Sequence, residues 1–202
     1  MPEHSALRRG HVVKLGGSLL GAPRLPELLR ALARHASPTL LVTGGGPFAD
    51  AVRDLQPTLR LSDPACHRMA ILAMEQTALA FADLAPGLVP VDSLEAIAEA
   101  GAAKRVAIWR PARLALEASE LPQSWELTSD SLAAWIAGES GAERLTLVKS
   151  APPAPGSGPN QWAEAGLVDP LFPRYAARVP GPVEVMTLDD ALSHFTKGSL
   201  AA

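Results

Sequence analysis

The sequence predicts an α/β protein in which a mostly parallel, open sheet lies between two layers of helices, a three-layer αβα sandwich. Short runs of β-favouring residues alternate with longer segments of helical period along the chain. Several runs are apolar on consecutive positions, which strands covered on both faces require. With 202 residues and 48% hydrophobic residues, the chain suits a single domain over residues 1–202.

Six runs are predicted as strands, and most are followed by a helical segment. In chain order they are His11–Leu15, Thr39–Thr43, Leu88–Val91, Arg105–Trp109, Arg144–Lys149 and Val183–Met186. Strand–helix–strand units repeated this often favour parallel pairing with right-handed crossovers.

Four intervening segments are predicted as helices: Arg24–Ala36, Pro64–Leu84, Asp92–Ala100 and Ser129–Ala137. The second follows Ser62 and Asp63, which are good N-cap residues, and has a proline in its first turn. Gly101 and Gly138 are expected to end the third and fourth helices. The proline- and glycine-rich segment Ala151–Asn160 is expected to be a loop at the carboxyl edge of the sheet, where ligands bind in open α/β sheets.

The composition argues against several classes of function. A net charge of -3 leaves no basic surface for nucleic acid or an anionic membrane. The single cysteine, Cys66, cannot form an intrachain disulfide, and no apolar run approaches the length of a membrane span. We therefore expect a cytoplasmic protein. The five histidines are scattered without ligand spacing, so no dedicated metal site is predicted.

Three strand ends share an unusual composition. They are KLGGSL (Lys14–Leu19), VTGGGPFAD (Val42–Asp50) and LVKS (Leu147–Ser150). Glycine lets backbone N–H groups approach an anion closely, and a helix N-terminus adds partial positive charge. Two of these strand ends also carry a lysine. Glycine-rich turns that converge with two ammonium groups indicate a polyphosphate ligand.

Two other phosphate motifs fit less well. The P-loop pattern is absent, because neither glycine turn is followed by Lys and Ser or Thr. The dinucleotide pattern is matched by Gly44, Gly46 and Ala49, but the acidic residue expected about 20 positions later is Asp63, which stands at a helix start. We interpret that match as incidental.

The segment LTSDSLAAWIAG (Leu127–Gly138) allows two interpretations. Ser129 or Asp130 could cap the helix that begins here. Alternatively, Asp130 could pair with Lys14 or Lys149 and hold their ammonium groups. The sequence by itself favours the cap.

The four segments KLGGSL, VTGGGPFAD, TSDSLAAW and LVKS, in this order, resemble the amino acid kinase superfamily, which includes acetylglutamate, aspartate, uridylate and isopentenyl phosphate kinases. The resemblance runs from about Val12 to Ser150 and continues weakly through Gly166–Ala176. The short length and the segment GLVDPLFP resemble a small branch linked to methanofuran biosynthesis. That branch phosphorylates (5-(aminomethyl)furan-3-yl)methyl phosphate to its diphosphate.

The resemblance implies residue roles. The implied catalytic residues are Lys14, Asp130 and Lys149. The implied nucleotide- and phosphate-binding residues are Gly16, Gly17, Ser18, Ser150, Gly156 and Gly158, and the acceptor-binding residues are Gly44, Gly45, Gly46, Asp50 and Ser129. The same resemblance divides the domain into an acceptor-binding half, about residues 1–125, and a nucleotide-binding half, about residues 126–202.

The activity implied is ATP-dependent phosphorylation of a small phosphate monoester, with Mg²⁺ held mainly by the ATP phosphates. An acceptor amine would want an anionic partner, and Asp50, Asp54, Asp63 and Glu75 are the candidates. A homo-oligomer is expected, because Pro64–Leu84 occupies a position that often pairs across a dimer in this superfamily. Two alternatives stay open: a carboxylate kinase of the acetylglutamate or aspartate type, and a non-catalytic nucleotide-binding or anion-storage subunit.

Overall fold

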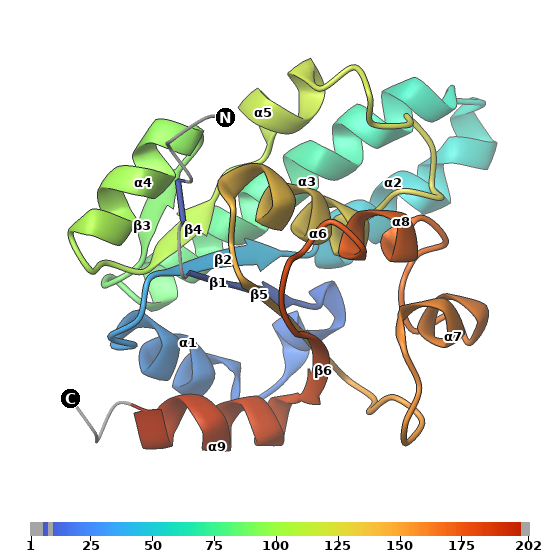
Figure 1. Ribbon diagram of the computed structural model, residues 1–202. Helices are drawn as coiled ribbons and strands as arrows, with labels where there is room; N and C mark the ends of the chain where they lie inside the picture. Colours follow the sequence, from blue (N-terminus) through green and yellow to red (C-terminus); the bar gives the residue numbers. More distant parts are fainter. Residues whose placement is uncertain (1–5, 8–9, 199–202) are drawn as a thin grey trace.

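The computed structural model describes residues 6–7 and 10–198 and contains a six-stranded, all-parallel sheet in the order β3-β4-β2-β1-β5-β6. Helices cover both faces of the sheet (Figure 1), which confirms the predicted α/β class. The strands are β1 (His11–Leu15), β2 (Thr39–Thr43), β3 (Val89–Val91), β4 (Ala107–Trp109), β5 (Arg144–Lys149) and β6 (Val183–Thr187). All six predicted strands are present, and three have the predicted bounds.

The helices form two layers with different members. The helical elements are η1 (Gly17–Gly21), α1 (Leu25–Ala33), α2 (Gly46–Leu59), α3 (Asp63–Leu84), α4 (Leu94–Ala102), α5 (Ala112–Glu117), α6 (Ser129–Ser140), α7 (Pro159–Glu164), α8 (Phe172–Ala176) and α9 (Leu188–Gly198). In Figure 1, α4, α6 and α8 lie above the sheet, and α1 and α9 lie below it. No helix among the described residues is long and apolar enough to cross a membrane.

Each central strand is buried on both faces. In β1, Val12 belongs to the core under α6, whereas Val13 and Leu15 belong to the core over α1 and α9. All five residues of β1 are buried, and so are all five of β2. Burial on both faces removes the selection for alternating polarity, so these strands read as continuous apolar runs.

Helix α3 passes the carboxyl end of β2 and contributes to both cores. Ile71 and Met74 lie in one core, and Ala78 and Phe81 lie in the other. The Thr43 hydroxyl, at the end of β2, donates to the Met74 carbonyl at 3.0 Å. The predicted start of this helix is confirmed, since the Ser62 side chain accepts a hydrogen bond from Ala65 N–H.

Three predicted helix ends are wrong. The first predicted helix, Arg24–Ala36, ends at Ala33, and two glycines do not end their helices. Helix α4 continues through Gly101 to Ala102, and α6 continues through Gly138 to Ser140. Helix α6 ends at Gly141, which has a left-handed φ of 70°. A glycine inside a helix costs only about 1 kcal/mol relative to alanine, and the burial of α6 outweighs that cost. Glycine position alone therefore did not locate the ends.

The order of the strands places a switch point between β1 and β5. The chain leaves β1 towards β2 on one side, and it leaves β5 towards β6 on the other side. In open α/β sheets, ligands bind outside the carboxyl ends of the strands at such a point. The three glycine- and lysine-bearing strand ends belong to β1, β2 and β5, so they meet at this edge.

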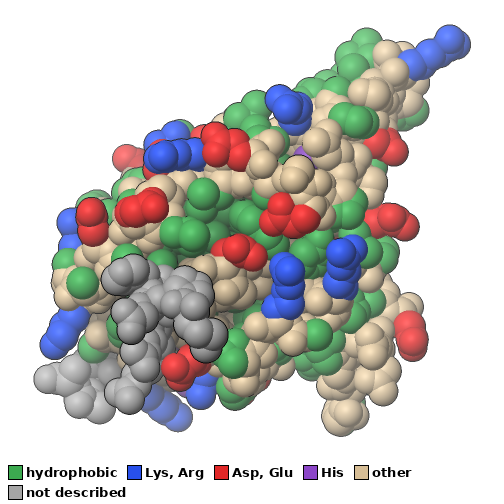
Figure 2. Space-filling model, turned by 45° about the horizontal axis from the view of Figure 1, so that its top comes forward, with side chains coloured by type: hydrophobic (Ala, Val, Ile, Leu, Met, Phe, Trp, Pro, Cys, Tyr) green, Lys and Arg blue, Asp and Glu red, His purple; other side chains and the backbone are tan. Residues whose placement is uncertain are grey.

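The surface seen in Figure 2 carries acidic and basic side chains interspersed around apolar ones. No large field of a single charge sign covers this face of the described residues. Charge of mixed sign fits the small net charge of -3 over the whole sequence.

The amino ends of β1 and β5 hold a buried histidine. The Nε2 atom of His11 lies 2.8 Å from the Thr146 hydroxyl, and the ring of His11 faces Phe195 of α9 at a centroid distance of 5.9 Å. Burial, followed by the nearby Arg144 guanidinium, lowers the pKa of His11 to about 3. Burial also lowers the pKa of His35 and of His67.

These histidines predict an acid-sensitive fold. The unfolded chain takes up these protons near pH 6.5, whereas folded His11 resists protonation until about pH 3. Between those values the unfolded state binds more protons, so each histidine lowers the free energy of unfolding by up to about 1.4 kcal/mol per pH unit as the pH falls. Urea unfolding of the His11→Gln variant between pH 7 and 4 should give a flatter dependence. His194→Gln, at an exposed position, is the control. If the free energy of unfolding of His11→Gln depends on pH as steeply as that of the wild type, His11 is not a source of the acid sensitivity.

Candidate active site

The pleat of the sheet directs two lysines to the same face. Lys14 has the parity of Val12 in β1, and Lys149 has the parity of Leu147 in β5. Val12 and Leu147 both belong to the core under α6, so both lysine side chains start from that face. The strands are adjacent and parallel, with Lys14 paired to Leu147, so the two ammonium groups rise from neighbouring strands near the carboxyl edge.

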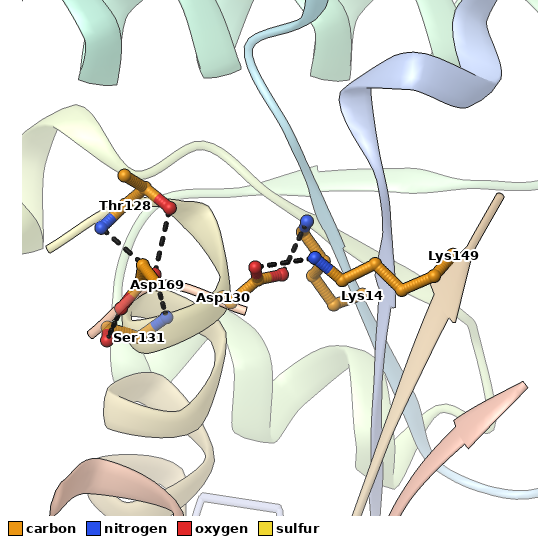
Figure 3. Close-up of polar contacts among 6 residues, drawn as sticks. All are labelled: Lys14, Thr128, Asp130, Ser131, Lys149 and Asp169. Carbon is orange, nitrogen blue, oxygen red and sulfur yellow. Dashed lines mark hydrogen bonds and ion pairs between the residues drawn. The ribbon is translucent and has the colours of Figure 1, made fainter. Parts of the chain in front are cut away.

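Asp130, in the first turn of α6, faces both lysines, and its carboxylate contacts the two ammonium groups (Figure 3). Its Oδ1 atom is 2.7 Å from Lys14 Nζ, and its Oδ2 atom is 2.6 Å from Lys149 Nζ. Lys14 is 2% exposed and Asp130 is 4% exposed, so this pair is shielded from water, whereas the Lys149 side chain is 14% exposed. This arrangement is the alternative interpretation of Asp130 from the sequence, in which its carboxylate pairs with the lysines and holds their ammonium groups.

The electrostatics of the cluster follow from its burial. Burial raises the pKa of Asp130, but the ammonium groups of Lys14 and Lys149 together outweigh it, so the carboxyl pKa lies below its ordinary value. Burial, followed by the charge of Lys14, lowers the pKa of Lys149. One carboxylate faces two ammonium groups, so a positive charge is left over for an anionic ligand.

The interpretation of Ser129 or Asp130 as the helix cap is wrong, because a distant residue caps α6. Asp169 Oδ2 accepts hydrogen bonds from the N–H groups of Thr128 and Ser131, at 3.1 and 3.0 Å. The hydroxyls of Thr128 and Ser131 also donate to this carboxylate (Figure 3). Asp169 lies in the segment GLVDPLFP, and no local sequence pattern indicates this contact.

The two glycine turns pack directly against each other. A Cβ atom on Gly17 would lie 2.5 Å from the Gly46 nitrogen, and one on Gly44 would lie 2.5 Å from the Gly17 nitrogen. Side chains at these positions would therefore force the turns apart. The N–H groups of Gly16 and Gly44 bond to the carbonyls of Val148 and Leu15, so neither is free for an anion. Glycine is needed here so that the two turns can pack against each other, and it would also allow a phosphate to approach the backbone.

A first cavity of about 260 Å³ lies over these turns. It is lined by Lys14, Lys149, Asp130, Gly17, Ser18, Gly44, Gly45, Gly46, Asp50 and Ser129 among the predicted site residues. Among the four candidate acids, Asp50 is the one that appears in this described lining. Asp63 accepts a hydrogen bond from Gln56 Nε2 at 2.7 Å, and Glu75 accepts one from Ala112 N–H at 3.1 Å. These two carboxylates are therefore engaged with other groups of the protein.

A second cavity of about 510 Å³ adjoins the first. It is lined by Ser18, Lys149, Ser150, Ala151, Pro152, Pro153, Ala154, Ser157, Gln161, Trp162, Ala165, Gly166 and Leu167. Gly156 and Gly158 are not among the described lining residues, whereas Ser157 between them is. Ser18 and Lys149 line both cavities, so the cavities meet at the lysine pair.

Three cavity residues were not predicted from the sequence. The Arg53 guanidinium lies 4.5 Å from the Trp125 ring centroid and 2.9 Å from Asp50 Oδ1. The Trp125 indole N–H donates to Gln56 Oε1 at 2.6 Å, which ties the loop before α6 to α2. His67 is buried in the wall of the first cavity, although no histidine is among the predicted site residues. The sequence could not place His67 at the site, because this residue lies on α3, outside the glycine turns and the other motifs, and tertiary packing brings it there.

Within residues 6–7 and 10–198, no group of three or more His, Cys, Asp and Glu side chains is placed to hold a metal ion. The nearest carboxylate to the lysines, Asp130, is already engaged by both of them. A divalent cation at this edge would therefore have to bring oxygen ligands from a bound phosphate and from water.

The chain is similar to proteins of known class. A curated relative from Methanocaldococcus jannaschii, named [5-(aminomethyl)furan-3-yl]methyl phosphate kinase, is 31% identical over 131 residues, which are 62% of this chain and 59% of that protein. The match therefore spans less than two thirds of the relative's length.

Solved structures share the fold at lower identity. Uridylate kinase from Archaeoglobus fulgidus superposes with a TM-score of 0.66 at 20% identity, covering 93% of this chain and 94% of that one. UMP kinase from Ureaplasma parvum gives 0.66 at 15% identity, covering 92% of each chain.

The profile of the amino acid kinase family matches residues 11–153, from the start of β1 to the loop after β5. This range contains all three residues of the lysine–aspartate cluster and both glycine turns, and it is well over half of the chain. The protein belongs to the amino acid kinase family.

Proposed function

We propose that this protein is an ATP-dependent phosphotransferase whose acceptor is a small phosphate monoester. The observation that carries the proposal is that two cavities meet at Lys149 and Ser18, beside the buried Lys14–Asp130 pair. Transfer between two bound ligands needs such a junction, with positive charge placed where they touch.

The chemistry asks little more of the protein than position and charge. Phosphoryl transfer spreads negative charge over the equatorial oxygens of the group in flight, and preorganised cations stabilise it. Lys14 and Lys149 are held by a common carboxylate, so their ammonium groups need little reorganisation when charge develops. A phosphate monoester attacks through an oxygen that is already anionic, so no strong general base is required. Bound Mg²⁺ would be carried by the ATP phosphates and would neutralise part of their charge.

The second cavity is assigned to the nucleotide. It follows β5 and is bordered by the loop after Lys149 and by Trp162, which lies within the half of the chain from about residue 126 to 202. Its volume of about 510 Å³ exceeds that of the first cavity, about 260 Å³, as a nucleotide requires relative to a small acceptor. The acceptor then occupies the first cavity, over the glycine turn that starts α2.

The acceptor assignment rests on the charged groups of the first cavity. Asp50 and Arg53 lie side by side there, 2.9 Å apart, and together offer a carboxylate to an ammonium group and a guanidinium to a phosphate. An acceptor with both groups matches this pair. The name of the curated relative supports (5-(aminomethyl)furan-3-yl)methyl phosphate as that acceptor, with the diphosphate as product.

The function can be tested by acceptor-dependent ADP release. The purified protein is incubated with ATP, Mg²⁺ and one acceptor at a time: the aminomethylfuran monophosphate, UMP, aspartate or acetylglutamate. ADP release with a monophosphate, and a diphosphate product by mass spectrometry, are expected. A hydroxylamine-trappable acyl phosphate would instead identify a carboxylate kinase. ATP binding without release for any acceptor would favour the non-catalytic alternative.

Loss of either lysine should reduce turnover without removing the fold. We expect Lys14→Ala and Lys149→Ala each to lower kcat by about a hundredfold or more, because each removes a preorganised cation from the transferring group. Lys197→Ala on α9 is the matched control and should keep full activity. Circular dichroism verifies folding, and near-normal turnover in both cluster variants would refute the assignment.

Asp50→Asn should weaken binding of the acceptor amine selectively. We expect the KM of the aminomethylfuran monophosphate to rise by about tenfold, since an exposed ion pair contributes up to about 1 kcal/mol and the lost hydrogen bonds add to it. The KM of an analogue without the amine should change little. Asp54→Asn, on the same helix but outside the described cavity lining, is the control. An equal rise for both acceptors would contradict the role of Asp50.

We propose that the protein self-associates through the outer face of α2 and α3. Leu72 and Leu79, one heptad apart on α3, are 47% and 54% exposed, and Phe48 and Leu55 on α2 are 43% and 42% exposed. Helices α2 and α3 pack against each other, so these exposed apolar side chains lie on adjacent helices that a second copy could cover. The double change Leu72→Glu and Leu79→Glu should shift the mass measured by analytical ultracentrifugation to that of a monomer. A monomeric wild-type protein would contradict the proposal.

A further inference from the structure

Asp169 lies outside both cavities and yet contacts the helix that carries Asp130. Its carboxylate accepts hydrogen bonds from the N–H groups and the hydroxyls of Thr128, the N-cap residue of α6, and Ser131, which follows Asp130 in the first turn (Figure 3). Asp169 is 8% exposed. A buried carboxylate with four donors is a strong and geometrically defined contact, because charged hydrogen bonds are about twice as strong as neutral ones.

We propose that Asp169 is a positioning residue that fixes the first turn of α6 so that both oxygens of Asp130 stay on the lysines. The proposal rests on the function proposed above, in which the lysine pair stabilises the transferring phosphoryl group. It assigns a role to a residue that touches neither lysine and lines neither cavity in the described part of the chain.

The proposal follows from a competition for the oxygens of Asp130. The first-turn N–H groups of a helix have no intrahelical partner and attract a nearby carboxylate. Asp130 sits in that turn, so its side chain is a natural candidate to turn back onto the Ser131 N–H. Asp169 already occupies this donor at 3.0 Å and the Thr128 N–H at 3.1 Å. With these donors engaged, Asp130 points away from its own helix towards Lys14 and Lys149.

Asp169 is itself held by the core. The Phe172 N–H donates to the Asp169 carbonyl at 3.1 Å, and Phe172 is fully buried and packs against Trp162. The Leu171 N–H donates to the Glu126 carbonyl at 3.2 Å, which joins the same segment to the chain just before α6. The carboxylate therefore reaches α6 from a rigid support rather than from a free loop.

The charge of Asp169 also acts on the cluster directly. Burial is the largest effect on the pKa of Lys149 and lowers it, while the negative charge of Asp169 is among the groups that raise it. If Asp169 is removed, and Asp130 turns back to cap its own helix, Lys149 loses negative charge in a buried place. The Lys149 pKa should then fall. Simple fraying of α6 would instead expose Lys149 to water and raise its pKa towards the ordinary value.

The small number of lysines allows the direction of the change in the Lys149 pKa to be measured without any enzymatic assay. The chain contains four lysines, Lys14, Lys104, Lys149 and Lys197, so lysine labelled with ¹³C at Cε gives four resonances. Each is assigned by a Lys→Arg variant, and its pKa is read from a pH titration. The titration is run on the wild-type protein and on Asp169→Ala, with Asp169→Asn as the milder variant that keeps the shape and loses the charge.

Ser93→Ala is the matched control, because Ser93 caps α4 by accepting from Ala96 N–H and is also 8% exposed. It removes a helix cap from a helix that carries no residue of the cluster. Both cap variants should lower the unfolding temperature, whereas Asp169→Ala alone should shift Lys149. In steady-state assays, kcat of Asp169→Ala should fall by about tenfold to a hundredfold, as expected when a catalytic group is displaced by about 1 Å, with a smaller change in KM.

The outcomes separate the proposals. A lower Lys149 pKa in Asp169→Ala, a smaller decrease in Asp169→Asn and no change in Ser93→Ala support the positioning role. An equal decrease in both Asp169 variants, which the lost charge alone would cause, overturns it, and so does an unchanged or higher Lys149 pKa. If Asp169→Ala does not fold, kcat of folded Asp169→Asn decides the question, and an unchanged kcat overturns the positioning role. A wild-type protein that transfers no phosphoryl group would overturn the proposed function, while the titration would still decide whether Asp169 positions Asp130.

Discussion

One buried carboxylate shared by two ammonium groups is the constraint around which the rest of the molecule is organised. Removing charges from water is costly, and a buried ion pair persists only when its geometry and hydrogen bonds compensate for the lost hydration. Asp130 meets this condition with one oxygen for each lysine, at 2.7 and 2.6 Å. The cluster nevertheless keeps one uncompensated positive charge. A site that holds such a charge out of water is prepared for an anion, and its electrostatic effect on that anion is larger than it would be at the surface.

Three features of the fold make this cluster possible. The pleat gives Lys14 and Lys149 the same face, and their strands are neighbours at the switch point of the sheet. The glycine turns after β1 and β2 approach so closely that a side chain on Gly17 or Gly44 would collide with the opposite backbone. Helix α6 then closes the cluster from above, with its first turn held by Asp169. Each feature is ordinary alone, and their coincidence at one sheet edge produces the site.

The sequence predicted what local pattern controls and missed what depends on distant contacts. Strands buried on both faces are continuous apolar runs, so β1, β2 and β5 were predicted with their observed bounds. The strand-end lysines were found because a cation has no reason to follow an apolar strand. The cap of α6 comes from Asp169, 38 residues beyond Ser131, and no local rule connects the two. His67 and Trp125 reach the cavity for the same kind of reason, since α3 and the loop before α6 are brought there by tertiary packing.

The arrangement of the cavities bears on whether the cluster serves a reaction or only stores an anion. A storage site needs one enclosed volume with its cations directed inward. Here Lys149 and Ser18 form part of the wall of two cavities, so a ligand in either one contacts the same ammonium group. Two anions placed this way would repel each other unless positive charge lay between them, and the lysine pair supplies it. Catalysis of phosphoryl transfer depends almost entirely on positioning and electrostatic stabilisation, and a shared cation provides both for the two partners at once. This geometry is therefore better suited to transfer than to retention.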